Sequence, residues 1–152
     1  MVVTYQGQES NEFTVKAAAS APSLFTANQE GWGQAAAINA ADGSVNTAVN
    51  PVRIGGFISL FATGEGQTAP AGVDGRLGGA TPARPVLPVS VTVGGIPATI
   101  QYAGSAPGQV AGLMQVNVQI PSRFPPGGYV PVILQVGDRS SGPAVWIAVS
   151  KN

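Results

Sequence analysis

The chain contains no cysteine and no histidine. Without cysteine it has no disulfide bond and no thiolate nucleophile. Without histidine it has no imidazole metal ligand and no histidine base for a serine or cysteine nucleophile. The sequence therefore lacks the side chains on which many hydrolytic and zinc-dependent active sites depend, and we expect no enzymatic activity, no bound metal and no cofactor.

Charge is also scarce in this sequence. Asp, Glu, Lys and Arg make up 9% of the residues, well below the roughly 25% of an ordinary soluble domain. Seven basic and seven acidic residues cancel, and because they are scattered they form no basic stripe for phosphates. We therefore expect no nucleic-acid partner. No run approaches the ~18 apolar residues of a membrane helix, so we expect no membrane insertion either.

What the sequence does contain is a series of short apolar runs separated by glycine and proline. The 21 glycines and 13 prolines fall between these runs, which is typical of many short strands joined by turns. Residues 114–120 alternate strictly, with Met114, Val116, Val118 and Ile120 predicted to point inward. The apolar run 57–62, bounded by glycines, predicts a strand that is buried on both faces.

These strands predict an all-β fold: an antiparallel, immunoglobulin-like β-sandwich over residues 21–152, preceded by an extra N-terminal β-hairpin. The cysteine and tryptophan pattern of antibody domains is absent, so the chain is not a true antibody-type domain. Residues 68–88 are rich in Ala, Gly and Pro and predict a long loop, which in a compact domain is either functional or mobile.

The N-terminal hairpin resembles the end of the same chain. A shift of 130 residues aligns positions 2–20 with 132–150 without a gap, giving six identities that include Gly7 on Gly137. Repeats of this kind indicate tandem modules. We interpret residues 1–20 as the closing hairpin of a preceding, similar module followed by a linker. With its own module missing, the hairpin exposes apolar strands, and we expect it to pack on its own domain or to form a homodimer.

A set of motifs supports a family resemblance over residues 21–150. The most specific are Leu-Phe-Ala-Thr-Gly-Glu-Gly-Gln-Thr at 60–68 and Met-Gln-Val-Asn-Val-Gln-Ile-Pro at 114–121, accompanied by segments 21–26, 33–39, 42–46, 50–51, 89–95, 102–104 and 106–108. Together they resemble the Solibacter-type C-terminal domain of uncharacterised bacterial proteins, a family expanded in acidobacteria. The resemblance implies a tail module of a long exported protein, similar to immunoglobulin-like modules of bacterial surface proteins. It implies no catalytic residues.

The expected location is extracellular or at the cell surface. The low charge and the surface rich in Asn, Gln, Thr and Gly favour an exported protein. The N-terminal residues lack a basic region followed by an apolar core, so they contain no signal peptide.

The acidic residues offer little for catalysis or metal binding. Glu65 and Asp74 are the only neighbouring acids in a loop region, and a carboxylate pair can hydrolyse glycosides. We interpret both as solvated turn residues. A calcium site would draw on Asp42, Asp74 and Asp138, but no clustered acidic motif accompanies them.

The best candidate for ligand binding is an aromatic residue in a loop. Trp32 lies between two glycines, with the amides of Asn28, Gln29 and Gln34 nearby in sequence, and such aromatics stack on sugar rings in carbohydrate-binding β-sandwiches. The alternative is that Trp32 covers one end of the sandwich, as large aromatics are highly buried on average. We favour the alternative, and expect Tyr102 and Trp146 to be in the core.

The sequence therefore predicts a non-enzymatic structural or adhesive module whose partners are other domains of the same polypeptide. The second prediction is a carbohydrate-binding module that uses Trp32, with a polysaccharide as its partner. Exposure of Trp32 distinguishes the two.

Overall fold

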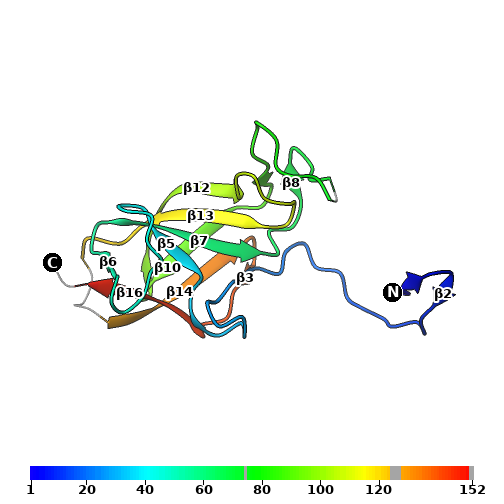
Figure 1. The fold of residues 1–152 in the computed structure, drawn as a ribbon, viewed down its shortest axis with the longest axis horizontal. Helices are drawn as coiled ribbons and strands as arrows, with labels where there is room; N and C mark the ends of the chain where they lie inside the picture. The colour runs from blue at the N-terminus through cyan, green and yellow to red at the C-terminus, as the bar shows by residue number, and fades with distance from the viewer. Residues whose placement is uncertain (74, 124–127, 151–152) are drawn as a thin grey trace.

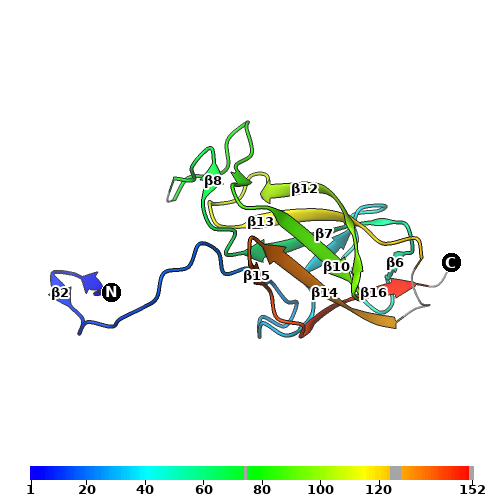
Figure 2. The same ribbon diagram turned by 180° about the vertical axis from the view of Figure 1, so that it is seen from behind.

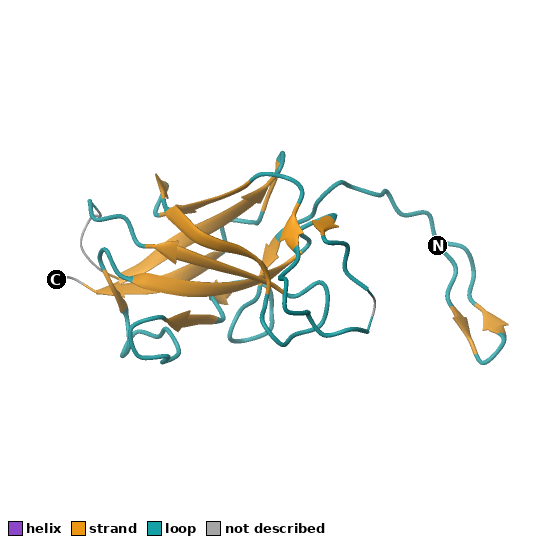
Figure 3. Ribbon diagram, turned by 90° about the horizontal axis from the view of Figure 1, so that it is seen from above, coloured by secondary structure: helices purple, strands orange, loops and turns teal. Residues whose placement is uncertain are grey.

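The computed structural model describes residues 1–73, 75–123 and 128–150. Within these ranges the chain forms β-strands joined by turns and loops and contains no helix (Figure 3). The predicted all-β class is confirmed.

The larger sheet has seven strands in the order β11-β10-β14-β16-β4, with β15 paired to β14 and β6 paired to β16. Its strands are β4 (Gly33–Gln34), β6 (Val52–Arg53), β10 (Val89–Val93), β11 (Ile96–Pro97), β14 (Gly128–Val136), β15 (Arg139–Ser140) and β16 (Val145–Ser150). The pairs are antiparallel except those of β16 with β4 and β6, which are parallel. The last strand of the chain therefore lies between early and late parts of the sequence.

The second sheet has five strands in the order β12-β13-β7-β3, with β5 also paired to β7, and all its pairs are antiparallel. Its strands are β3 (Ser23–Leu24), β5 (Ala37–Asn39), β7 (Phe57–Thr63), β12 (Thr99–Ser105) and β13 (Met114–Gln119). Figures 1 and 2 show this sheet and the larger one as the two layers of a sandwich-like body.

The core is a single apolar cluster between the layers, with side chains from both sheets. Strand β13 contributes as predicted: Met114, Val116 and Val118, with Ile120 just beyond the strand, are fully buried, and the residues between them are half-buried. Period-two burial of this kind is what a strand with one face on a core requires.

The prediction that residues 57–62 are buried on both faces is wrong. Strand β7 alternates, with Ile58, Leu60 and Ala62 buried and the residues between them half-buried. Phe57 and Phe61 are apolar but lie on the outer face, so the continuous apolar run reflects a partly covered outer surface, since a folded protein cannot cover its whole surface with polar atoms.

Two aromatic residues expected in the core lie at its margin. The register of β12 against β13 shifts between Ile100 and Tyr102, so an irregularity interrupts the predicted alternation. Tyr102 is half-buried, and so is Trp146 on β16. The ring of Trp146 meets that of Tyr129 edge to face, with centroids 6.0 Å apart.

The predicted loop at 68–88 is closed at its base by two short strands. Strand β8 (Thr68–Ala69) pairs with β9 (Arg84–Pro85), and the intervening chain extends from one end of the body (Figure 1). The segment is therefore an excursion that leaves and re-enters the body at one place.

At the N-terminus, strands β1 (Thr4–Tyr5) and β2 (Gln8–Glu9) pair with each other and with no other strand in the described part of the chain. Gln6 and Gly7 both have positive φ, of 48° and 76°, which is typical of a two-residue hairpin turn. Both Figure 1 and Figure 2 show this hairpin away from the body, at the end of an extended segment.

Candidate functional site

The segment that leads from the hairpin to the body is fixed where it meets both sheets. Ser20 is buried, and its Oγ donates to the carbonyl oxygen of Val136 on β14 at 2.7 Å. Ala21 N donates to the carbonyl oxygen of Gly64, just after β7, at 2.9 Å. One end of the linker is therefore bonded to both layers of the body.

Glycines make this contact possible. A Cβ added at Gly64 would lie 1.9 Å from the carbonyl oxygen of Ala21, and one at Gly66 would lie 2.1 Å from that of Ala19. Both glycines also have positive φ, where side chains are strained. The Gly64-Glu65-Gly66 motif, which the sequence indicates only as a turn, is thus the surface on which the linker lies. We name Ser20, Ala21, Gly64, Gly66 and Val136 the linker seat.

The N-terminal hairpin has the same strand pairing and the same serine bonds as the hairpin formed by β14 and β15. Ser10 Oγ accepts the backbone N–H of Val3 at 3.0 Å, and Ser10 N donates back to Val3 O at 2.9 Å. Ser141 does the same with Leu134, at 3.0 and 2.8 Å. The structure thus equates residues 131 positions apart, one residue away from the gapless alignment of the sequences.

The strand registers agree with this offset. Tyr5 pairs with Gln8 as Val136 pairs with Arg139. The offset also places apolar side chains of the N-terminal hairpin at the positions of core residues. Met1, Val3 and Tyr5, which are 64%, 58% and 72% exposed, correspond to Val132, Leu134 and Val136, each 0% exposed.

Trp32 is 54% exposed, so the expectation that it covers one end of the sandwich is wrong. It lies in the loop before β4, between Gly31 and Gly33, both of which have positive φ. A loop held by two such glycines turns sharply, and the indole is left at the surface.

The three amides predicted to accompany Trp32 are not equally free. Asn28 is folded back on its own loop: its Nδ2 donates to Glu30 Oε2 at 3.1 Å, and its Oδ1 accepts from Glu30 N at 3.3 Å. Gln34 donates its Nε2 to Asn46 Oδ1 at 2.9 Å. Gln29 is exposed. The exposed pair of Trp32 and Gln29 is the part of the predicted set that remains open to a ligand.

Gln34 belongs to a buried amide network that the sequence does not indicate. Asn46 is fully buried, and its Nδ2 donates to Asn39 Oδ1 at 3.0 Å and to Ala148 O at 2.9 Å. Its Oδ1 accepts from Ala148 N at 2.8 Å. An amide with these bonds replaces a missing strand partner beside β16. The network therefore serves the fold, because it holds the loop after β5 against the last strand.

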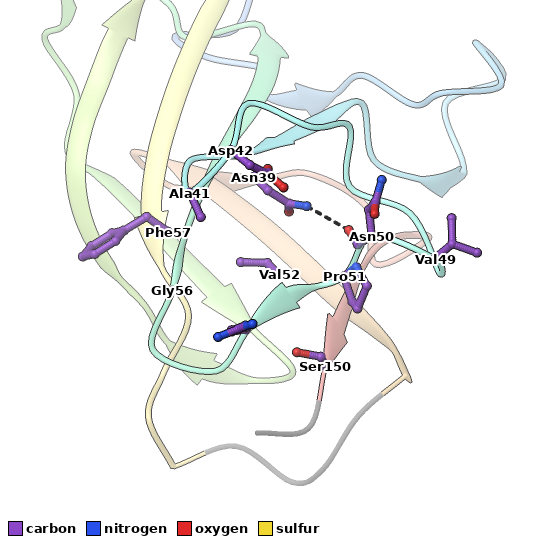
Figure 4. Close-up of a pocket in the computed structure, with 11 residues that line it drawn as sticks. Asn39, Ala41, Asp42, Val49, Asn50, Pro51, Val52, Gly56, Phe57 and Ser150 are labelled. Atoms are coloured by element: carbon purple, nitrogen blue, oxygen red, sulfur yellow. Dashed lines mark hydrogen bonds between the residues drawn. The ribbon is translucent and has the colours of Figure 1, made fainter.

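Two surface hollows flank this network. One, of about 1000 Å³, is lined by polar and apolar residues around Asn39, Asn50 and Ser150. In Figure 4 the Asn39 amide points to Asn50, whose carbonyl oxygen accepts its Nδ2 at 2.8 Å. Asp42 is at its rim, and the N–H of Ser44 donates to its Oδ1 at 3.0 Å, which lowers the pKa of the Asp42 carboxyl. Both polar groups are thus engaged within the fold.

The second hollow, of about 510 Å³, lies on the outer face of the larger sheet and is lined by Gln34, Thr47, Ala48, Val49, Tyr129 and Trp146. Gln34 Oε1 and Trp146 Nε1 are both buried, and neither has a hydrogen-bond partner within the part of the chain that the structure describes. This edge-to-face aromatic pair, with an adjacent amide, is a second aromatic surface besides Trp32.

Glu65 contradicts the expectation of a solvated turn residue. It is 5% exposed, and its Oε2 has no hydrogen-bond partner among the described residues. Burial raises the pKa of this carboxyl above its ordinary value. Asp74, the other member of the predicted carboxylate pair, lies outside the described residues.

The structure brings no metal-binding cluster together among the residues it describes: no three acidic side chains meet there. No helix in the described ranges is long and apolar enough to cross a membrane. No family model, curated protein or solved structure matches this chain.

Proposed function

We propose that this chain is a non-enzymatic structural module of a larger exported bacterial protein, in which immunoglobulin-like β-sandwiches follow one another. One observation carries the proposal: the N-terminal hairpin repeats the register and the serine bonds of the β14–β15 hairpin while its apolar side chains are exposed. Apolar residues at core positions need a core. We infer that residues 1–16 complete the core of a preceding sandwich.

The linker seat gives such a module its mechanical role. Because Ser20 and Ala21 are bonded to both sheets, a preceding module would be held at a short, partly fixed spacing. The low surface charge and the resemblance to bacterial surface modules support an extracellular setting. The partners that follow from this are neighbouring domains of the same polypeptide.

A graft tests the assignment of the hairpin. Residues 132–141 are replaced by residues 1–10, carrying Tyr5→Val so that the core is not overfilled. With the 131-residue offset, Val3 replaces Leu134 and Ser10 replaces Ser141. We expect cooperative unfolding in denaturant, with a free energy of unfolding lowered by about 1–3 kcal/mol because the repacking is imperfect.

The control uses the same ten residues in place of 131–140, which reproduces the gapless alignment. A shift of one residue turns every side chain to the opposite face, so this variant should not unfold cooperatively. If both grafts fold equally well, or neither folds, the hairpin is not a module-closing hairpin.

A second copy of this chain is the competing candidate for the partner that covers the exposed apolar face of the N-terminal hairpin. Light scattering on the whole chain and on a variant with Val3→Thr, Tyr5→Thr and Phe13→Thr separates the two cases. A dimer that the triple variant abolishes assigns the exposed face to self-association, whereas a monomer in both supports a preceding module as its partner.

Carbohydrate binding is the second candidate, favoured by the exposure of Trp32. A polysaccharide pull-down followed by tryptophan fluorescence tests it. We expect binding to be lost in Trp32→Ala and kept in Tyr129→Ala, which removes an exposed aromatic residue from strand β14. Loss in Tyr129→Ala alone moves the site to the hollow beside β16, and absence of binding by the wild-type chain removes this candidate.

A further inference from the structure

A buried carboxylate without a partner lines a hollow beside the 68–88 excursion. Glu65 is 5% exposed, and no donor in the described structure reaches its Oε2. The hollow has a volume of about 590 Å³, and Glu65 is one of the residues that line it. A charged group buried in this way is costly unless a donor or an opposite charge accompanies it.

The described residues supply no such opposite charge. Their only ion pair joins Asp138 and Arg139 on the surface. Arg84 packs on Tyr102, with its guanidinium carbon 5.3 Å from the centre of the ring, and forms no ion pair with Glu65. Arg76 lines an adjoining hollow of about 300 Å³ but makes no ion pair with Glu65. No described cation therefore pairs with this carboxylate.

The other residues that line the hollow leave room for a small hydrogen-bond donor. Thr68 Oγ1 donates its hydrogen to Pro70 O at 3.0 Å, so only its lone pairs face further partners. Ser105 is buried and adds a hydroxyl group to the lining. The rest of the lining consists of Gln67 and of small residues that leave room for an alkyl stem, namely Gly64, Gly66, Ala71, Gly72, Ala111 and Gly112.

We propose that this hollow binds a primary ammonium group, which donates an N–H to the Glu65 carboxylate. An ammonium carries its charge on one small centre with several N–H donors. This matches one carboxylate set among hydroxyl groups. A divalent metal fits less well, because calcium takes six to eight oxygen ligands, usually from several carboxylates, and among the described residues Glu65 is the only carboxylate on the lining.

The test follows Glu65 directly on the whole chain. The protein is labelled with ¹³C at glutamate Cδ and titrated at neutral pH with propylammonium chloride. Tetramethylammonium chloride and sodium chloride at equal ionic strength serve as comparators. Tetramethylammonium has the same charge but no N–H to donate. We expect a saturable shift of the Glu65 signal with propylammonium only, and a rise in the thermal midpoint by mass action.

Two variants complete the experiment. Glu65→Gln keeps the shape but removes the charge, and it should weaken propylammonium binding by at least roughly tenfold, as read from the thermal midpoint. Glu9→Gln removes an exposed acid from the N-terminal hairpin and should leave the binding unchanged. Equal responses to propylammonium and tetramethylammonium, or a midpoint shift that persists in Glu65→Gln, would overturn the proposal. Neither result bears on the hairpin graft.

Discussion

The β1–β2 hairpin and the β14–β15 hairpin share their strand register but differ in what covers them. Residues 3–10 and 134–141 have the same pairing and the same pair of serine bonds. Leu134 lies fully in the core, whereas Val3 is 58% exposed. The register is therefore encoded locally, by a few residues and one hydroxyl group. Burial, which supplies most of the stability, depends on what the rest of the chain places against the hairpin.

The largest difference that we expect between the two hairpins is in the stability lost when an apolar side chain is shortened. Leu134→Ala should lower the free energy of unfolding by about 2–5 kcal/mol, because it leaves a cavity in a packed core. Val3→Ala, the equivalent change in the N-terminal hairpin, should stay within about 0.5 kcal/mol. Denaturant titration of both variants measures the difference. A large loss from Val3→Ala would mean that the hairpin already packs against a core in solution.

Removing the serine hydroxyl should also cost more stability in the β14–β15 hairpin than in the N-terminal hairpin, but the difference should be smaller than for the apolar residues. Ser141→Ala leaves the buried N–H of Leu134 without its acceptor, at a cost of about 1–3 kcal/mol. Ser10→Ala exposes the N–H of Val3 to water, which can replace the bond, so global stability should not change. Denaturant titration is again the measure, and equal losses would show that the two bonds are equally buried.

The glycines at the linker seat and in the N-terminal turn offer a third contrast. Gly66→Ala forces positive φ on alanine, at about 1–2 kcal/mol, and pushes the linker away, since the new Cβ would meet Ala19 O. Gly7→Ala has similar strain but open space around it. Thermal unfolding should detect only the first change. Amide hydrogen exchange at Ser20 and Ala21 should rise in Gly66→Ala alone.

The smallest effect that we expect is the dependence of stability on pH through Glu65. Because the pKa of Glu65 is raised in the folded protein, its contribution to stability is complete below the unfolded pKa and is lost as the pH rises through the folded pKa. Glu65→Gln should therefore match the wild type in acid and become the more stable of the two towards neutral pH. Glu9→Gln, in the exposed hairpin, should show no such trend. Thermal midpoints across the acidic range measure it, and a difference independent of pH would contradict it.

The sequence predicted those strands in which apolar and polar residues alternate. Strand β13 follows the alternation of Met114 to Ile120, and the turns at glycine pairs separate strands as expected. For β7 the pattern failed, because Phe57 and Phe61 are apolar residues on the outer face. Composition alone does not separate a doubly buried strand from one with an apolar outer surface.

The site was predicted less well, since side-chain environment depends on contacts distant in sequence. Nothing near Glu65 in the sequence shows that the 68–88 excursion and residues 105–112 shield it. Asn46 lies in a segment with the composition of an ordinary loop. Its burial becomes evident only in the folded chain, where β16 lies beside it. Trp32 was expected to be covered because of its size, yet its loop carries it outward.

The linker seat also determines how a pulling force would enter the body. The extended segment between the N-terminal hairpin and β3 reaches the body at one end, and β16 ends at the other (Figure 1). Tension between these points is directed along the strands. It would load the Ser20–Val136 and Ala21–Gly64 bonds together with the parallel pairs of β16 to β4 and β6. Bonds loaded along the strand direction share the load, and we therefore expect the fold to resist stretching from end to end.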